Sequence, residues 1–218
     1  MKTKAFDFKE LTISAEAVII STIHIDDLGW IVYSGRDVEI YKQSIGQSCY
    51  CYLRDNTPSV YREVVNRWAD QGIKRVVFIS ETDQVDGEVC SAVVVTDHIN
   101  VSGINPLIGP NDEIRGTRFP DMTDLYSGAL SAQVKRCCTV AGLSVCERLL
   151  LVPKGMARRT DLEKRILALR KDVIISQDIF SGVITARHRS LSSAGMFLYN
   201  GLATQRKTVL IKALLEQI

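Results

Sequence analysis

The stretch from Val93 to Tyr126 carries the densest set of side chains that can bind a ligand or fix a backbone. It opens with the apolar run Val93–Thr96, which predicts a buried strand. A long loop rich in glycine, proline and asparagine follows, and such loops are uncommon in a compact domain unless they have a function. Asn and Asp side chains bond readily to nearby backbone groups, so we expect them to hold this loop. The residues expected to do so are Asp97, Asn100, Asn105, Asn111 and Asp112.

Acid–base chemistry has one further candidate pair. Glu81 and Asp83 follow an apolar strand, and two neighbouring carboxyl groups can act as a general acid and a general base. Solvated carboxylates in a turn are the commoner explanation of such a pair. His24 has no cysteine or second histidine at zinc-ligand spacing, so no metal site is predicted.

Several motifs resemble those of a known family. The segments DHIN (from Asp97), NPL-x-GPND (from Asn105) and GTRFPDMTDLY (from Gly116) resemble the central signature of the trimeric purine nucleoside phosphorylases. The later segment Thr185-Ala186-Arg187-His188 is similar to the family's ARH segment. The resemblance implies one α/β domain over residues 1–218, with a mixed central sheet flanked by helices.

The same resemblance implies a homotrimer, with the central loop at the subunit contact. It also makes His98, Arg187 and His188 scaffold or subunit-contact residues rather than bases or ligands. The family cleaves a purine nucleoside with phosphate, giving the base and ribose 1-phosphate. A nucleoside-like small molecule is therefore the expected ligand, and no cofactor is implied.

The family's phosphate-binding positions are altered in this chain. After the first strand the family has a glycine-rich loop, whose backbone amides approach an anion closely. Here the turn carries Ser21 and Thr22, lacks those glycines and adds Asp26 and Asp27. Either hydroxyl can still donate to an oxyanion, although a capped turn is the simpler interpretation.

A second phosphate position is altered as well. The segment Gly46–Tyr52 lacks the arginine and histidine with which the family grips phosphate, and only Arg54 lies nearby. Loss of an anion's cationic partners costs several kcal/mol, on the order of 1–3 kcal/mol for each charged hydrogen bond. We therefore expect the phosphate site to be lost.

Positions for purine and ribose are also replaced. Arg158 or Arg159 stands where the family has the glutamate that accepts the purine N–H, and arginine is only a donor. Gln177 and Asp178 replace the family's Met-Ser under the ribose. Asn200 is one residue away from the position of the family's purine-binding asparagine.

Apolar runs alternate with helical patterns along the chain, as in an α/β domain. Strands are predicted at 17–22, 30–33, 38–41, 48–53, 75–80, 144–152, 173–176 and 191–199. Helices are predicted at 58–71, 127–136, 161–169 and 205–218. In the third helix we expect Leu162, Ile166 and Leu169 to face inward; in the last, Val209, Ile211, Leu214 and Leu215 are expected to pack on the sheet.

Composition excludes several classes of protein. A formal charge of +2 over 218 residues, with no basic tract, argues against a nucleic-acid partner. The first apolar run is too short to span a membrane and lacks a signal-peptide pattern. The six cysteines match neither a zinc ribbon nor a redox motif, so we expect reduced thiols in a cytoplasmic protein.

Three hypotheses about function follow. The first is a phosphorylase-like protein that has lost most catalytic contacts and acts as a binding or structural module. The second is an enzyme of the same family with a changed substrate, in which Arg158 or Arg159 meets an anionic group and Asp178 serves the ribose. The third is an active purine nucleoside phosphorylase. The replaced positions favour them in that order, because phosphorolysis needs both a positioned phosphate and a stabilised leaving base.

Overall fold

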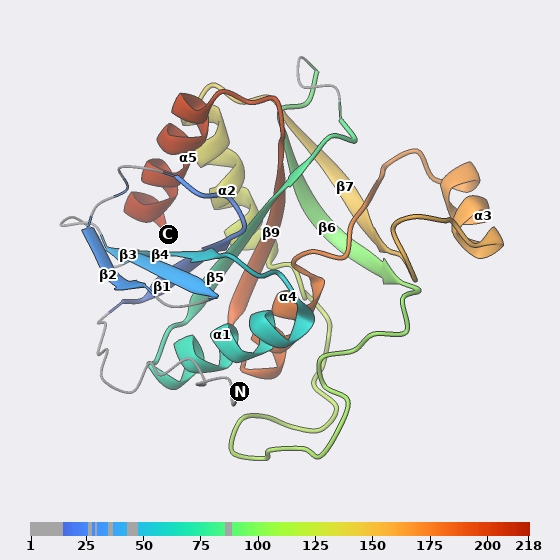
Figure 1. The fold of residues 1–218 in the computed structure, drawn as a ribbon, viewed down its shortest axis with the longest axis horizontal. Coiled ribbons are helices and arrows are strands. Elements are labelled where there is room, and N and C mark those ends of the chain that lie inside the picture. The colour runs from blue at the N-terminus through green and yellow to red at the C-terminus, as the bar shows by residue number, and fades with distance from the viewer. Residues whose placement is uncertain (1–14, 26–27, 29, 35–36, 43–47, 86–88) are drawn as a thin grey trace.

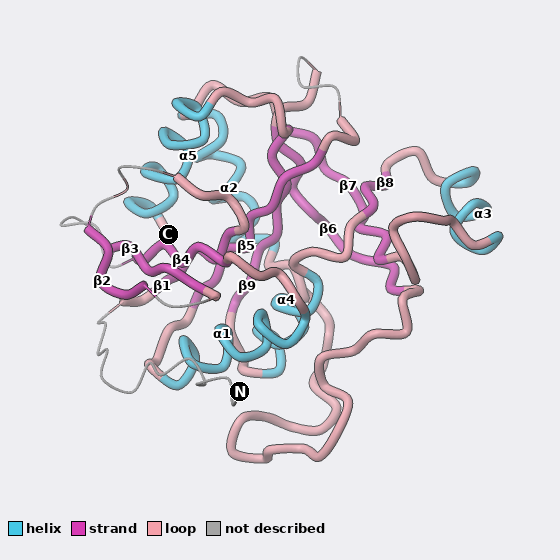
Figure 2. Tube along the Cα trace, in the orientation of Figure 1, coloured by secondary structure: helices cyan, strands magenta, loops and turns pink. Residues whose placement is uncertain are grey.

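One mixed sheet organises the part of the chain that the structure describes (Figures 1 and 2). The computed structural model describes residues 15–25, 28, 30–34, 37–42, 48–85 and 89–218. Within these ranges nine strands are ordered β2-β3-β4-β1-β5-β9-β6-β7-β8. The strands are β1 (Ala17–Ser21), β2 (Trp30–Ser34), β3 (Val38–Lys42), β4 (Ser48–Leu53), β5 (Arg75–Thr82), β6 (Ala92–Asn100), β7 (Val145–Val152), β8 (Val173–Ile175) and β9 (Ser192–Tyr199). The helices are α1 (Pro58–Asp70), α2 (Gly128–Val140), α3 (Asp161–Leu169), α4 (Phe180–His188) and α5 (Thr204–Gln217).

The direction of the strands decides which ends meet. β1 runs parallel to β4 and β5, and β5 runs parallel to β9, so these four strands share one carboxyl edge. β9 pairs antiparallel with β6 over only three residue pairs, after which β6, β7 and β8 diverge from it. This divergence lets the end of β8 return to the end of β5, where the backbone N–H of Ile175 donates to Gln84 Oε1 at 2.9 Å.

Two apolar cores cover the two faces of the sheet. One packs α1 and α4 against the sheet through residues such as Trp68 and Phe180, both almost fully buried. The other packs α2 and α5 through Val134 and Leu214. Figure 1 shows the same grouping, with α2 beside α5 and α1 beside α4. The fold is therefore the predicted α/β class, with helices on both faces of a mixed sheet.

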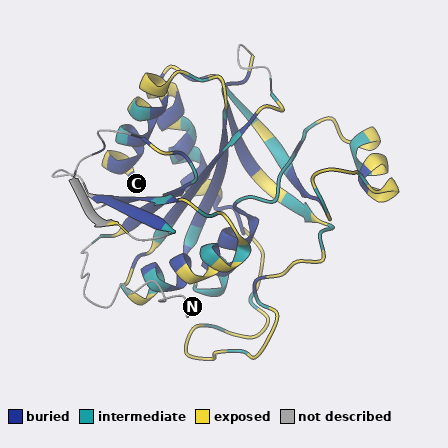
Figure 3. Cartoon of the chain, viewed as in Figure 1, coloured by how far each residue is buried: buried dark blue, intermediate teal, exposed yellow. Residues whose placement is uncertain are grey.

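α3 departs from its predicted packing. It stands away from the sheet, and its surface is largely exposed (Figure 3). Leu162 and Leu169, predicted to face inward, are 56% and 83% exposed, because no layer of the described chain covers this helix. Glu163 is its buried residue instead, accepting backbone N–H groups of Lys154 and Thr160 at the helix start. In α5, Val209 is likewise 42% exposed, whereas Ile211, Leu214 and Leu215 are buried as predicted.

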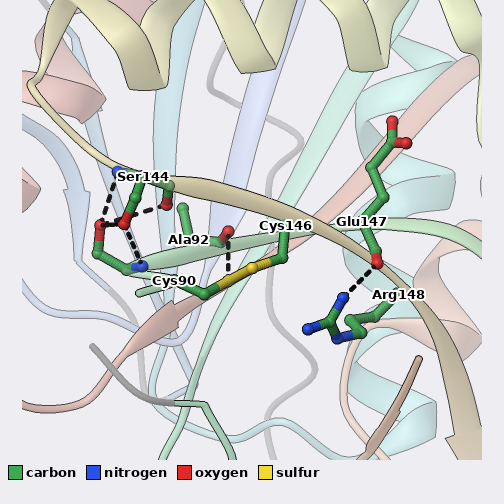
Figure 4. The surroundings of a disulfide bond; sticks show 7 residues. Cys90, Ala92, Ser144, Cys146, Glu147 and Arg148 are labelled. Atoms are coloured by element: carbon green, nitrogen blue, oxygen red, sulfur yellow. Dashed lines mark hydrogen bonds between the residues drawn. A yellow bond between two sulfur atoms is a disulfide. The ribbon is translucent and has the colours of Figure 1, made fainter. Parts of the chain in front are cut away.

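The prediction of reduced thiols is wrong for one pair of cysteines. Cys90 and Cys146 form a disulfide that joins the segment before β6 to β7 (Figure 4). They are brought together because β6 and β7 are neighbouring parallel strands that begin side by side. The other four cysteines are buried and form no disulfide with any residue that the structure describes.

Candidate functional site

A polar cluster centred on Asp178 lies where the ends of β1, β4, β5 and β8 meet. Ser80 Oγ donates to one carboxylate oxygen of Asp178 at 2.7 Å, and Asn56 Nδ2 donates to the other at 2.8 Å. The hydroxyls of Thr22 and Ser80 are 3.0 Å apart and hydrogen-bonded. We call Thr22, Asn56, Ser80 and Asp178 the Asp178 cluster. Its hydroxyl, amide and carboxyl groups are of the kinds that bind sugar hydroxyls.

The backbone holds Asp178 in an uncommon way. Ile179, which follows it, is fully buried with φ 60° and ψ −34°, and Phe180 N donates to the Asp178 carbonyl at 2.7 Å. This is a γ-turn of the rare positive-φ type, which is costly for a β-branched residue. Strained backbone of this kind clusters at ligand-binding sites, where the surrounding structure enforces it.

The environment of Asp178 also shifts its ionisation. Burial raises the pKa of the Asp178 carboxyl above its ordinary value, against the opposing effect of hydrogen bonds from Ser80, Ser176 and Asn56. A half-buried carboxyl with a raised pKa can exchange a proton with a bound ligand.

Two cations near these strand ends are each paired with a carboxylate of the chain itself. The Arg54 guanidinium pairs with Glu39, which is only 7% exposed. Tyr41 donates to Glu39 at 2.8 Å, and with Arg54 it keeps the pKa of Glu39 below its ordinary value despite burial. Lys207 is 9% exposed and pairs with Glu81. Because each positive charge is already matched, neither adds net positive charge to this edge.

The predicted site residues are only partly brought together. Thr22 and Asp178 belong to one cluster. Ser21 is fully buried, and its oxygen accepts the N–H of Ile23 at 3.0 Å, so this hydroxyl serves the turn. Gln177 donates to the carbonyl of Pro153 at 2.9 Å and thereby ties the segment after β7 to the segment after β8.

The remaining predicted residues lie on exposed segments or outside the described residues. Arg158 is exposed, and Arg159 donates at 3.2 Å to the carbonyls of Gly155 and Met156 in its own loop. Asn200 is exposed, and its carbonyl accepts from Lys207 at 3.3 Å. The proposed acid–base pair is not formed as such, because Glu81 pairs with Lys207. Asp26, Asp27, Gly46 and Gln47 lie outside the described residues.

Sequence reasoning missed Asn56 and Ser80. Ser80 ends a predicted strand and Asn56 precedes a predicted helix, which are positions where polar side chains face a strand-end site. Their pairing with Asp178, however, depends on the return of β8 towards β5, a long-range feature that no local pattern reports.

The central loop is held as its composition predicts. Asn105 Oδ1 accepts the N–H of Leu107 at 2.9 Å, and Asp112 Oδ1 accepts that of Ile114 at 3.2 Å. Asn100 accepts from Ser102 at 3.0 Å. Asp97 and Asn111 also make short-range bonds, to the N–H of His98 at 2.7 Å and the carbonyl of Gly116 at 3.2 Å.

The three motif residues that flank this loop have structural partners. His98 Nδ1 is 3.2 Å from the Tyr126 hydroxyl, and burial lowers the pKa of this imidazole. Arg187 Nε donates to the carbonyl of Asp121 at 2.6 Å, which ties α4 to the loop. His188 is half-buried at the end of α4, beside Gly116.

The arrangement of sheet and helices is that of the nucleoside phosphorylase class of α/β proteins. A structure of purine nucleoside phosphorylase in complex with ribose-1-phosphate has a TM-score of 0.76 at 18% identity, covering 97% of this chain and 93% of that one. The Schistosoma mansoni purine nucleoside phosphorylase in complex with acetate has a TM-score of 0.77 at 17% identity, with the same coverage. At these identities the likeness establishes the fold.

Sequence comparison finds relatives over about half of the chain. Purine nucleoside phosphorylase 1 of Geobacillus stearothermophilus is 35% identical over 111 residues, 51% of this chain and 40% of the relative. The Bacillus subtilis counterpart is 31% identical over 104 residues, 48% of this chain and 38% of the relative. No family model matches. The chain is therefore similar in sequence to the purine nucleoside phosphorylases and shares their fold, and the matched segment spans about 40% of the length of these curated relatives.

None of the helices in the described ranges has the length and hydrophobicity of a membrane span.

Proposed function

We propose that this protein keeps the phosphorylase scaffold but does not catalyse phosphorolysis, and that it binds a nucleoside-like molecule at the Asp178 cluster. The observation that carries the proposal is the pairing of Arg54 with Glu39 and of Lys207 with Glu81. A phosphate-binding enzyme needs uncompensated donors at the place where the anion sits. Here the two cations at the strand ends, Arg54 and Lys207, already pair with carboxylates of the chain itself.

Electrostatics adds a second obstacle. Glu39 and Glu81 are matched by their cations, but the Asp178 carboxylate is held by Ser80 and Asn56, which carry no charge. A phosphate placed beside Asp178 therefore meets a like charge in a partly desolvated site. Each lost charged contact costs on the order of 1–3 kcal/mol. Loss of several such contacts together lowers a rate by many powers of ten, since about 1.4 kcal/mol corresponds to a factor of ten.

Ligand binding is favoured by the geometry of Asp178. Its carboxylate is held by two donors, follows a strained turn and has a raised pKa, all features of sites that contact ligands. A ribose hydroxyl donating to Asp178 and accepting from Ser80 or Thr22 suits these groups. This position also keeps open a second candidate function, an enzyme with a changed substrate in which Asp178 acts as a general acid.

The assembly we propose is a homotrimer formed through the central loop. Ile114 and Phe119 are 98% and 88% exposed, and Ile108 is 70% exposed. Apolar side chains concentrated on one loop are typical of a surface that another chain covers. The resemblance to the trimeric phosphorylases gives the same assembly.

We also propose a cytoplasmic location, which is supported by four buried cysteines that form no disulfide with described residues, Cys49, Cys51, Cys137 and Cys138. The Cys90–Cys146 disulfide argues against a cytoplasmic location, because disulfides are rare in cytoplasmic proteins. Cell fractionation of the tagged protein tests the proposal: recovery with cytoplasmic markers would support it, and recovery outside the cytoplasm would contradict it.

The test of the central proposal is hypoxanthine release from inosine, with and without phosphate, beside an active purine nucleoside phosphorylase as positive control. We expect no phosphate-dependent release. Turnover at ordinary enzyme rates in the presence of phosphate would overturn the proposal. Release that is independent of phosphate would instead establish the second candidate, with water as the acceptor.

A further inference from the structure

A separate cavity lies between α1, α4 and the central loop. Its volume is about 190 Å³, and its lining residues are Arg62, Asn66, Pro106, Leu107, Ile108, Pro110, Asn111, Asp112, Arg115, Thr185 and His188. It is distinct from the Asp178 cluster, because α4 starts beside Asp178 and ends at His188. Nine residues of helix span about 13 Å at 1.5 Å per residue.

The walls of this cavity are fixed by the family motifs. The turns at Asn105 and Asn111 are closed by their own side chains, as described above. Gly116 lies so close to the end of α4 that an added Cβ would be 2.2 Å from the carbonyl oxygen of His188. Gly116, which opens the GTRFPDMTDLY motif, thus contacts the end of TARH, and Asn111 of NPL-x-GPND donates to the Gly116 carbonyl. The three motifs surround one preformed space.

The polar groups of the lining are incompletely matched. Arg62 donates once, from Nη1 to the carbonyl of Pro106 at 3.2 Å, which leaves other N–H groups of the guanidinium for a ligand. Arg115 pairs with Asp112 at 3.2 Å. The side-chain oxygen of Asn66 is buried and has no hydrogen-bond partner among the described residues. A buried acceptor without a donor is costly, so such atoms call for an explanation.

Charge and protonation define the ligand class. Two arginines against Asp112 leave the lining with an excess positive charge. Burial, helped by Arg189 and Arg115, lowers the pKa of His188 despite Asp112, so its imidazole is neutral at neutral pH and can both donate and accept. An anionic group fits beside Arg62, and hydroxyl groups fit Asn66 and His188.

We propose that this cavity binds a small hydroxylated oxyanion, with Arg62 as its charged partner and Asn66 as an acceptor for a ligand hydroxyl. The site acts independently of the Asp178 cluster. It gives the motifs NPL-x-GPND and TARH a ligand-binding role in addition to the structural role predicted from the sequence.

The test is calorimetric titration of the purified, assembled protein with glycerol 3-phosphate, glycerate, inorganic phosphate and glycerol. We expect both hydroxylated anions to bind, inorganic phosphate to bind more weakly and glycerol not to bind. Arg62→Gln should weaken glycerol 3-phosphate at least about tenfold, a loss of about 1.4 kcal/mol. The matched control is Arg165→Gln on the exposed α3, which should bind as the parent does.

Two further variants keep the result interpretable. Asn66→Leu removes the unpartnered oxygen at similar size and should leave the fold intact. It should weaken the hydroxylated anions but not inorganic phosphate. Ser80→Ala, in the Asp178 cluster, should change none of these affinities. Absence of anion binding by the parent protein, or equal binding by parent and Arg62→Gln, would overturn the inference. Binding lost in Ser80→Ala but kept in Arg62→Gln would assign the anion to the strand ends and would contradict this inference.

Discussion

Burial and hydrogen bonds shift the pKa of the Asp178 carboxyl in opposite directions, and burial has the larger effect. The net rise makes the free energy of unfolding depend on pH. Burial raises the folded-state pKa of Asp178 above the unfolded value, so the native protein holds this proton to higher pH than the unfolded chain does. Its contribution to stability is therefore greatest at low pH and falls as pH rises through the folded pKa. Asp178→Asn should show a smaller fall in the free energy of unfolding between about pH 4 and pH 7, the range above an ordinary Asp pKa.

Urea unfolding at a series of pH values measures this difference. Asp83→Asn, a change at an exposed carboxylate, is the matched control and should follow the parent profile. Identical profiles for Asp178→Asn and the parent would show that the carboxyl is not held as the structure has it.

The Lys207–Glu81 pair predicts an asymmetry between its two partners. The Lys207 side chain is 11% exposed, whereas the Glu81 side chain is 35% exposed. Removing Glu81 leaves a buried ammonium without its carboxylate, but removing Lys207 leaves a carboxylate that water still reaches. We expect Glu81→Ala to cost about 1–3 kcal/mol, the cost of a buried donor left without its partner, and Lys207→Met to cost less. Chemical denaturation of both variants decides this, and a larger loss for Lys207→Met would refute it.

Among the elements, the contact between the central loop and α4 is the most sensitive to a single methyl group. Gly116→Ala should be destabilising by about 1–3 kcal/mol, because its Cβ meets the backbone of His188. Gly128→Ala at the start of α2 is the control, since no atom lies within 4 Å of its added Cβ. It should be neutral or stabilising by about 0.4–1 kcal/mol. Equal unfolding midpoints for the two variants would contradict the close approach.

The elements also show how far the sequence predicts the structure. Apolar runs predict β4 at its observed bounds and α1 to within one residue, since both show clear periodicity or contiguous burial. α4 escaped prediction because Phe180–Ala186 is buried on every side and shows no amphipathic pattern. The apolar stripe of α3 predicts a face packed on the sheet, and this prediction is wrong. Periodicity shows which face of a helix is apolar but not whether another layer covers that face.

At the candidate site the sequence predicts some of the residues but not how they pair. Thr22 and Asp178 are predicted from the family motifs that they replace, and each is hydrogen-bonded to Ser80. The pairing of Arg54 with Glu39 and of Lys207 with Glu81 was not predicted, because these partners are 15 and 126 residues apart and no short-range pattern links them.

At the scale of the whole molecule the central loop predicts assembly. Light scattering after gel filtration should give about three times the chain mass of 24.3 kDa. Phe119→Asp together with Ile114→Asp should reduce the mass towards one chain, because both side chains are almost wholly exposed and apolar. Val140→Asp, at a 64% exposed position on α2, is the control and should leave the mass unchanged. A parent protein of single-chain mass would contradict the proposed trimer.

The most direct test of the central claim is a single-turnover experiment with protein in excess over inosine, following hypoxanthine with and without phosphate. Excess protein detects even a slow chemical step and separates it from weak substrate binding. We predict no hypoxanthine release above that of a protein-free blank in either condition, because the cations at the strand ends are held by Glu39 and Glu81. Release that increases with phosphate and yields ribose 1-phosphate would contradict the account and show that these pairs open to admit the anion.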